Sequence, residues 1–222
     1  MQKSGIFKTY YNSGEIKNEC FHNNGIREGQ SKIYYESGQL YIKCNYINGK
    51  KNGRYEEYWE NGNLSETCTF VDDKINGELN SFHADGQIYR KCTYIDDKKN
   101  GIYEEYNQNG TIYIKCRYIN DMKEGVYTEY HFNRQLYEQC DYVNDKKYGK
   151  YMLYHNNGQL KSICEYEDDI IQGNYIKYYY NGKIHEEHSY IDGKINGEYI
   201  RYNLDGSIKA IYIYINDILQ TE

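Results

Sequence analysis

The chain has 222 residues, of which 39% are hydrophobic, and a formal net charge of −6 at pH 7. This acidic balance argues against general binding to nucleic-acid phosphates, which need clustered positive charge. No run of about 18 apolar residues occurs, so we expect no transmembrane helix. Residues 1–7 lack the apolar segment of a signal peptide. We therefore expect an intracellular, cytoplasmic protein.

Glycine marks an internal repeat along the whole chain. One glycine column recurs every 24 residues, at Gly5, Gly29, Gly53, Gly77, Gly101, Gly125, Gly149, Gly173 and Gly197. Proline is absent and tyrosine occurs 31 times, a composition that favours strands over helices. A unit this short cannot bury a core alone and must stack on its neighbours.

These features predict an all-β fold, an elongated single-layer array of about nine 24-residue β-hairpin repeats. Residues 1–4 form a short lead-in, residues 5–216 form the nine tandem repeats, and residues 217–222 form a C-terminal tail. The first repeat matches the repeat pattern less well than the others, since Phe7 stands at a position where tyrosine recurs. Terminal repeats that face water are expected to be atypical.

The first turn of each repeat is a dipeptide such as Asn61-Gly62, Asp85-Gly86 or Ser37-Gly38. These dipeptides predict two-residue type I′ hairpins, which need positive φ at both positions. Asn133-Arg134 departs from the pattern. An arginine at positive φ costs about 1 kcal/mol, so we expect this turn to be the distorted one.

The turn also predicts which residues face each other across the hairpin. With Asn61 and Gly62 at its centre, Tyr55 faces Cys68, Glu56 faces Thr67 and Tyr58 faces Ser65. One face of the sheet then carries the columns of Tyr55, Trp59, Leu64, Cys68 and Phe70. The other carries the Tyr58 column with its expected partners Tyr41, Tyr89, Tyr113 and Tyr137. Tyr55 and Tyr58 are three residues apart, so either the sheet rolls or a bulge intervenes.

The second turn, which joins one hairpin to the next, is predicted to be longer than the first. It contains lysine pairs at Lys50-Lys51, Lys98-Lys99 and Lys146-Lys147, and aspartate pairs such as Asp72-Asp73. The aspartate pairs lack the ligand spacing of a calcium loop and predict solvated turns. The lysine turns either form a solvent-exposed charged edge or contact phosphates. Neighbouring aspartates cancel much of the positive electrostatic potential of these lysines.

The seven cysteines and six histidines do not predict a metal site, a disulfide or an active site. Cysteine occurs once per repeat in one column, and two strands separate neighbouring copies by about 10 Å. Disulfides need Cα atoms within about 7 Å, and zinc needs convergent ligands. We expect small buried thiols kept reduced. His83, His131 and His155 share a ring-bearing column with Trp59. No catalytic residues, cofactor or small-molecule substrate are expected.

The C-terminal third contains the sharpest signal for a binding site. A column that is mostly polar in earlier repeats becomes Met152, Ile176 and Ile200, and Ile163 and Ile211 lie opposite. Ile213 follows in the last repeat, where residues 211–215 are apolar on both faces. A strip of this kind next to an unpaired strand edge is a place for a partner or a second copy to dock, or a self-covering end. The candidate partner-binding residues are Met152, Ile163, Ile176, Ile200, Ile211 and Ile213.

The repeat resembles the MORN repeat, and more closely the MORN-variant repeat. Tyr55-Glu56-Glu57-Tyr58, Asn61-Gly62, Leu64 and Phe70 carry the likeness, which covers residues 5–216. The resemblance implies a hairpin array used for protein–protein contact, and membrane or phosphoinositide association in some relatives. It brings no catalytic residues. The copies here lack the Gly-Glu-Trp core of the common MORN unit.

The sequence therefore predicts a non-catalytic scaffold or adaptor that mediates protein–protein interaction. The protein partner is unknown, and self-association through the C-terminal edge is one form of this prediction. Two alternatives stay open. One is a peripheral phosphoinositide or membrane-surface binding protein that uses the lysine turns, and the other is an antitoxin-like partner of a toxin.

Overall fold

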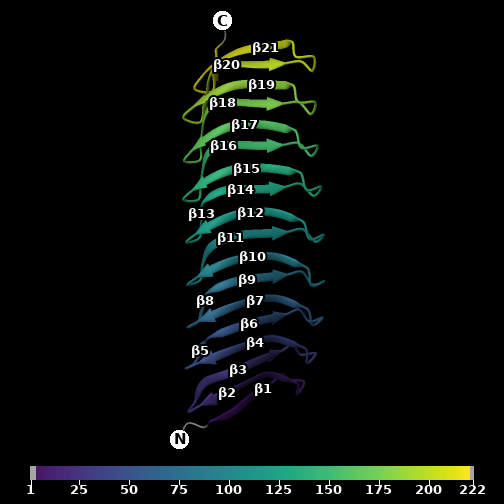
Figure 1. The fold of residues 1–222 in the computed structure, drawn as a ribbon, viewed down its shortest axis with the longest axis vertical. Helices are drawn as coiled ribbons and strands as arrows, with labels where there is room; N and C mark the ends of the chain where they lie inside the picture. Colours follow the sequence, from purple (N-terminus) through teal and green to yellow (C-terminus); the bar gives the residue numbers. More distant parts are fainter. Residues whose placement is uncertain (1–3, 221–222) are drawn as a thin grey trace. The chain divides into compact units, whose positions relative to one another are not determined.

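The computed structural model describes residues 4–220, which divide into two units at the turn between Thr111 and Ile112. Figure 1 shows strands and connecting turns throughout, without a helix in the described range. The fold is all-β and is built from hairpin repeats of about 24 residues, as predicted. Residues 1–3 of the predicted lead-in and residues 221–222 of the predicted tail lie outside the described residues.

Unit 1 is an antiparallel sheet that contains four complete hairpins followed by strand β11. Its strands are β1 (Gly5–Tyr10), β2 (Ile16–Asn23), β3 (Ile26–Tyr34), β4 (Leu40–Ile47), β5 (Lys50–Lys51), β6 (Gly53–Tyr58), β7 (Leu64–Val71), β8 (Lys74–Ile75), β9 (Gly77–Phe82), β10 (Ile88–Ile95) and β11 (Lys98–Tyr106).

Unit 2 begins with one strand and continues with four hairpins of the same kind. Its strands are β12 (Ile112–Ile119), β13 (Met122–Lys123), β14 (Gly125–Tyr130), β15 (Leu136–Val143), β16 (Lys146–Tyr154), β17 (Leu160–Glu167), β18 (Ile170–Tyr178), β19 (Ile184–Ile191), β20 (Lys194–Tyr202), β21 (Ile208–Ile215) and β22 (Ile218–Leu219). The short β22 pairs with the end of β21.

The two kinds of turn are the reverse of the prediction. In the first turn the Gly62 N–H donates to the Trp59 carbonyl at 2.8 Å, and only Gly62 has positive φ, at 86°. This is a three-residue loop, a type I turn followed by a left-handed glycine. The second turn is the two-residue type I′ turn, since Asp72 and Asp73 have φ of 50° and 70°. The dipeptide Asn-Gly is compatible with both turn types, so the sequence alone did not distinguish them.

The side chain at the third position of the first turn explains the preference for Asn, Asp or Ser there. The Asn61 Oδ1 accepts from the Asn63 N–H at 3.0 Å, and the Asp85 Oδ1 accepts from the Gln87 N–H at the same distance. These short side chains thus imitate a backbone turn.

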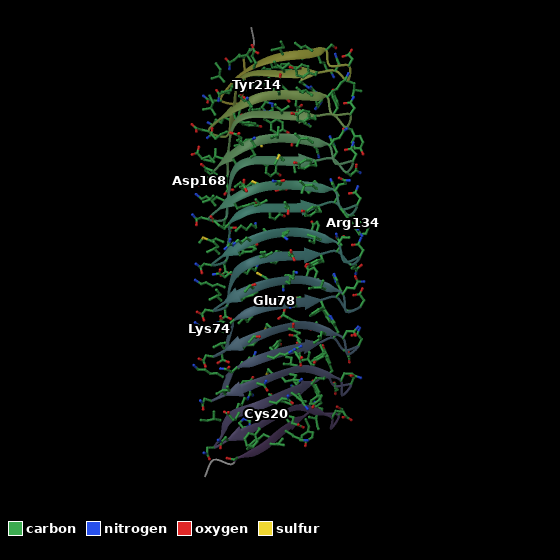
Figure 2. The ribbon with its side chains drawn as sticks, in the orientation of Figure 1. Cys20, Lys74, Glu78, Arg134, Asp168 and Tyr214 are labelled. Atoms are coloured by element: carbon green, nitrogen blue, oxygen red, sulfur yellow. The ribbon has the colours of Figure 1, made fainter. Side chains whose placement is uncertain are left out.

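Arg134 does have positive φ, at 70°, but its turn is not distorted. The Arg134 N–H donates to the His131 carbonyl at 2.8 Å, and the His131 N–H donates to the Gln135 carbonyl at 2.8 Å, as in the other repeats. The loop needs only one left-handed residue, so the arginine leaves its hydrogen bonds intact. Figure 2 labels Arg134 at one margin of unit 2 and Asp168 at the opposite margin.

The predicted register holds along most of each hairpin. Tyr55 faces Cys68 and Glu56 faces Thr67, as expected. The exception is Tyr58, which faces Leu64 and not Ser65, because a bulge interrupts the register after Glu57. The bulge answers the question that the spacing of Tyr55 and Tyr58 left open.

The bulge also moves the tyrosines that were predicted to accompany the Tyr58 column. The Tyr41 ring lies 4.7 Å from the Tyr35 ring, and the Tyr89 ring lies 5.0 Å from the His83 ring. Tyr137 likewise contacts the His131 ring at 5.0 Å. Tyr41, Tyr89 and Tyr137 therefore belong to the column of Trp59 and not to the column of Tyr58, so this part of the prediction is wrong.

A second irregularity separates successive hairpins and explains the glycine column. Ile47 faces Lys50 across the type I′ turn, whereas Lys43 faces Glu56, so the register slips by two residues at Asn52-Gly53. Gly53 has φ of 92° there. At Gly101, an added Cβ would lie 3.0 Å from the Thr93 Cβ. The glycine column therefore marks bulges between hairpins and not turns.

The core lies on one face of each sheet, which we call the core face. In unit 1 it contains Cys44, Tyr55, Cys68 and Leu79, each at most 8% exposed. Unit 2 uses the same columns, with Tyr127 and Tyr142 packed edge to face at 5.8 Å. The predicted core columns of Tyr55, Cys68 and Phe70 are confirmed.

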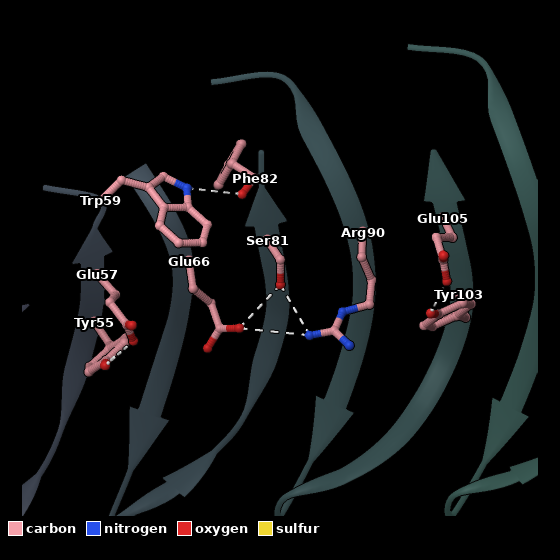
Figure 3. A network of polar contacts seen from close by, with 9 residues as sticks. All are labelled: Tyr55, Glu57, Trp59, Glu66, Ser81, Phe82, Arg90, Tyr103 and Glu105. Atoms are coloured by element: carbon pink, nitrogen blue, oxygen red, sulfur yellow. Dashed lines mark hydrogen bonds and ion pairs between the residues drawn. The ribbon is translucent and has the colours of Figure 1, made fainter. Parts of the chain in front are cut away.

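Polar side chains tie neighbouring strands together on the core face of unit 1 (Figure 3). The Tyr55 hydroxyl donates to Glu57 at 2.7 Å, and the Ser81 hydroxyl donates to Glu66 at 3.1 Å. Arg90 then donates to the Ser81 hydroxyl at 3.2 Å. Side chains that interact along and between hairpins supply the stability that a single repeat lacks.

Candidate functional site

The face opposite the core carries one continuous row of directly paired residues through each unit, one residue per strand. In unit 1 the row is charged or polar: Lys8, Glu19, Lys32, Lys43, Glu56, Thr67, Asn80, Lys91 and Glu104. We call it the charged row. In unit 2 the row reads Lys115, Thr128, Gln139, Met152, Ile163, Ile176, Glu187, Ile200 and Ile211.

Three pairs of neighbours in the charged row of unit 1 form ion pairs: Lys8 with Glu19, Lys43 with Glu56 and Lys91 with Glu104. Lys8 lies 3.0 Å from Glu19, and Lys43 lies 2.9 Å from Glu56. Burial alone would raise the pKa of Glu56, but hydrogen bonds from Lys43 and Tyr58 and the nearby charge of Arg54 hold that pKa below its ordinary value. The carboxylate is therefore ionised and fully engaged at neutral pH.

The second part of the unit 2 row has no such internal partners. Met152 faces Ile163, and Ile163 faces Ile176 on the next strand. Ile200 faces Ile211, which is 52% exposed. We call Met152, Ile163, Ile176, Ile200 and Ile211 the apolar row. Ile211 is exposed and the other four side chains are half-buried, and a contiguous apolar patch that faces water marks an interaction site.

The structure thus brings five of the six predicted binding residues together in one row. The sixth, Ile213, is 43% exposed and lies on β21 two residues from Ile211, so it shares the same face. Glu187 interrupts the row between Ile176 and Ile200 and accepts a hydrogen bond from the Tyr202 hydroxyl. The spatial continuity of the row could be read from register alone, but the role of Glu187 could not.

Two hollows open beside the apolar row, each at a bulge between hairpins. The first has a volume of about 340 Å³ and is lined by Ile163, Glu165, Gly173 and Ile176, among others. The second has a volume of about 270 Å³, and Ile176, Glu187 and Ile200 contribute to its lining. These hollows were not predicted from the sequence, although the glycine column marks where they occur.

Acidic side chains flank the apolar row on one side. Glu165 and Glu198 lie two residues from Ile163 and Ile200 on the same strands, so they share the face. Both are exposed, and no ion pair to either carboxylate is found within residues 4–220. On the other side lie Tyr154 and Tyr202. The Tyr154 hydroxyl lies 3.4 Å from the Met152 sulfur.

The lysine turns are largely engaged within each unit. The Lys51 Nζ lies 4.8 Å from the centroid of the Phe70 ring, and the Lys147 Nζ lies 4.2 Å from that of Tyr151. Lys146 lies 3.8 Å from Asp168. Rings and carboxylates of the same sheet therefore compete with any phosphate for these ammonium groups.

The aspartates of the second turn have a structural part that the sequence analysis did not foresee. The Asp73 Oδ1 accepts from the Lys51 N–H at 2.7 Å, and the Asp169 Oδ1 accepts from the Lys147 N–H at 2.8 Å. The second aspartate of each pair thus joins its turn to the preceding repeat and is not simply solvated.

The seven cysteines are buried free thiols, and their predicted burial is confirmed. Burial raises the pKa of the Cys68 thiol to about 12 and that of Cys164 to about 11, so both stay protonated. His188 replaces cysteine in the eighth repeat and lies between the rings of Tyr175 and Tyr199, at 4.8 and 4.6 Å. Within residues 4–220, no group of three His, Cys, Asp or Glu side chains is placed to hold a metal ion.

These features define a β-hairpin repeat protein with an apolar row on the face opposite its core. The sequence profile of the MORN repeat variant matches residues 3–24, 27–48, 51–72, 75–96, 99–120, 147–168 and 171–192. These matches cover more than half of the chain, and the chain belongs to the MORN repeat variant family. Residues 121–146 and 193–222 are unmatched, yet the hairpins β14–β15 and β20–β21 form there as well.

The remaining comparisons carry no argument about function. No match was found among proteins with curated descriptions. Among solved structures, a TarM mutant from S. aureus in complex with Fondaparinux, alpha-GlcNAc-glycerol and UDP is similar at 14% identity, with a TM-score of 0.25, over 54% of this chain and 19% of that chain. TcdB2-TccC3 is similar at 9% identity, with a TM-score of 0.25, over 96% of this chain and 15% of that chain.

The chain thus spans less than a fifth of the length of these solved chains. Repeats of the family generally serve as protein- or membrane-binding modules and not as enzymes. No helix long and apolar enough to span a membrane occurs in the described part of the chain.

Proposed function

We propose that this chain is a non-catalytic repeat scaffold that binds a protein partner through the apolar row of unit 2. The observation that carries the proposal is the difference between equivalent rows: charged or polar residues throughout the row of unit 1, and the five residues of the apolar row in unit 2. The five side chains of the apolar row, four half-buried and Ile211 exposed, lie beside two hollows on the face opposite the core. Such a face lowers its free energy when a partner removes it from water.

The test compares which proteins of a cell extract are retained by the immobilised full chain and by two variants of it. The first variant, Ile163→Thr with Ile176→Asn, gives unit 2 the residues that Thr67 and Asn80 supply at the same place in unit 1. The control, Ile102→Asn, removes an isoleucine that is 54% exposed outside the row. We expect that at least one protein is retained by the wild type and by the control, and that the row variant does not retain it. Equal retention by all three would overturn the proposal.

The lysine turns lead to the rival proposal, binding to phosphoinositide or to a membrane surface. Because rings and carboxylates engage Lys51, Lys146 and Lys147, we expect no flotation with phosphoinositide liposomes at about 0.15 M salt, where the screening length is about 8 Å. Flotation that disappears when the six turn lysines are changed to glutamine would favour the rival. The six are Lys50, Lys51, Lys98, Lys99, Lys146 and Lys147.

A second copy of the chain is the simplest protein partner. Within the described residues, β21 pairs with β20 and, at Tyr214 and Ile215, with β22. We expect any self-association at this edge to disappear in the variant Ile211→Lys with Ile213→Lys, as measured by light scattering. An unchanged mass would contradict self-association through this edge.

A further inference from the structure

The spacing, width and charge of the apolar row narrow the kind of partner that it fits. Its two hollows lie at successive bulges, one hairpin apart, and two strands correspond to about 9.6 Å. A partner that lies across the strands must therefore present a large side chain toward the sheet about every 9 to 11 Å, which matches the distance between the hollows.

An extended strand does not meet this condition, but a helix does. In a strand, residues on one face recur at about 6.6 and 13.2 Å. In an α-helix, the same face recurs after seven residues, a rise of about 10.5 Å. Positions three or four residues further along lie between these two anchors and would cover Ile176, which lines both hollows.

The width of the face agrees with a helix as well. The acidic flank at Glu165 and Glu198 and the flank at Tyr154 and Tyr202 lie four residues apart along the strands, about 13 Å. An α-helix with its side chains is about 10–12 Å wide. A polyproline helix has a suitable repeat of about 9.3 Å, but it presents one side chain per turn and leaves the residues between the hollows uncovered.

Charge selects among amphipathic helices. Glu165 and Glu198 are exposed on one flank, and Glu187 lies within the row. Lys150, which faces Glu165, is the basic residue of that flank between β16 and β21. A helix with lysine or arginine beside its apolar stripe would meet these carboxylates, whereas an acidic helix would be repelled.

We propose that the apolar row of unit 2 docks a basic amphipathic helix across strands β16–β21, with apolar residues of successive heptads in the two hollows. This inference rests on the proposed protein-binding function and names the class of partner. The helix contributes the apolar stripe, and the acidic flank fixes which way its basic side points.

The test uses three synthetic peptides and the full chain. The first is a leucine–lysine peptide of about two heptads, with leucine at the helix-repeating positions. The second carries glutamate in place of lysine. The third has the composition of the first, with leucine and lysine strictly alternating, so that its pattern has the period of a strand. Binding is measured by isothermal titration calorimetry at about 0.15 M salt.

We expect the helical basic peptide to bind at least tenfold more tightly than either of the other two, about 1.4 kcal/mol. The variant Ile163→Thr with Ile176→Asn should lose about the same factor, and Ile102→Asn should not. The variant Glu165→Gln with Glu198→Gln should lose less and should bind with a weaker dependence on salt. This last variant separates the flank from general attraction to an acidic chain.

Equal binding of the alternating or acidic peptide would overturn the inference, as would no binding of the helical basic peptide. Either outcome can be told apart from failure of the proposed function. If capture from extract still depends on Ile163 and Ile176, the protein-binding face stands and its partner is not a basic helix. If neither experiment depends on these residues, both proposals fail.

Discussion

The two units use the same backbone position in opposite ways. Lys43 and Glu56 of unit 1 form an ion pair at 2.9 Å, whereas the paired residues Ile163 and Ile176 of unit 2 are aliphatic. Both pairs bridge two successive hairpins. Lys43 and Glu56 satisfy each other's charge within the sheet, so a partner protein that covered them would gain little free energy. The aliphatic pair leaves apolar area in water, which a partner can cover.

This difference teaches that the repeat fold does not depend on what the row contains. The register is the same in both units, with a bulge after Glu57 and after Lys177 at equivalent positions. The fold is held by the core face, by the turns and by the backbone ladder. The residues of the row on the opposite face can therefore differ between the units without a change in the fold.

The largest effect should come from breaking one ion pair of the charged row. Replacing Lys43 by isoleucine removes the cation 2.9 Å from the Glu56 carboxylate, which is 8% exposed, and leaves Arg54, 2.8 Å away, as its remaining ion-pair partner. We expect the free energy of unfolding to fall by about 1–2 kcal/mol, less than for a deeply buried pair because Lys43 is partly exposed and Arg54 still pairs with Glu56. Chemical denaturation with hydrogen exchange on β4 and β6 would measure the loss.

The matched control converts the pair to the type found in unit 2. Lys43→Ile with Glu56→Ile removes both charges and should leave stability within about 1 kcal/mol of the wild type. If the double variant is as unstable as the single one, the row in unit 1 cannot be exchanged for that of unit 2. The comparison between the units would then fail.

A smaller effect should distinguish the units by pH. Burial lowers the pKa of His188, so the folded state favours the neutral ring. As pH falls through about 6.5, the unfolded chain binds a proton first, and stability decreases until the folded pKa is reached. We expect unit 2 of the wild type to lose more stability between pH 7.5 and pH 5.5 than unit 2 of His188→Cys. The difference should correspond to the binding of one proton by a single imidazole in the unfolded chain.

Hydrogen exchange of β19 and β20 at the two pH values would show this difference. His188→Cys restores the residue that seven other repeats carry, so it serves as its own structural control. The charged row of unit 1 should respond at lower pH. Because the folded pKa of Glu56 is lowered, its contribution is lost only as pH falls below the ordinary value of 4.5. Identical pH profiles for His188→Cys and the wild type would contradict this account.

The smallest effect should come from the three-residue loop that has Arg134 where the equivalent loops of the described repeats have glycine. Arg134 has φ of 70°, where glycine has no steric penalty. Arg134→Gly should raise the free energy of unfolding by about 0.5–1 kcal/mol, reduced by the extra freedom of glycine in the unfolded chain. Thermal unfolding would detect the gain. A loss of stability would mean that the arginine side chain contributes more than its backbone costs.

The sequence was sufficient to predict the repeat, the hairpins, the buried cysteine column and the pairing of Glu56 with Thr67. These follow from periodicity, which nine copies make unambiguous. The turn types were not predictable from the dipeptides, because Asn61-Gly62 fits a three-residue loop as well as a type I′ turn. The bulge at Tyr58 was foreseen only as one of two options.

The candidate site could be predicted in part. The column of Met152, Ile176 and Ile200 was visible as a change in residue type, and the register placed Ile163 beside it. The hollows were not visible, because they arise where the register slips at Gly173 and Gly197. The engagement of Lys51 and Lys147 by aromatic rings was also hidden, because it depends on side-chain direction.

The most direct test of the binding face compares the oxidation of two methionines in the same unit. Met152 lies in the apolar row, and Met122 is 40% exposed on the short strand β13 and is not part of the row. The rate of sulfoxide formation by hydrogen peroxide is measured by mass spectrometry with and without the leucine–lysine helical peptide. We predict that the peptide slows oxidation of Met152 severalfold and leaves Met122 unchanged. Equal slowing of both, or no slowing of Met152, would contradict the assignment of the apolar row as the binding surface.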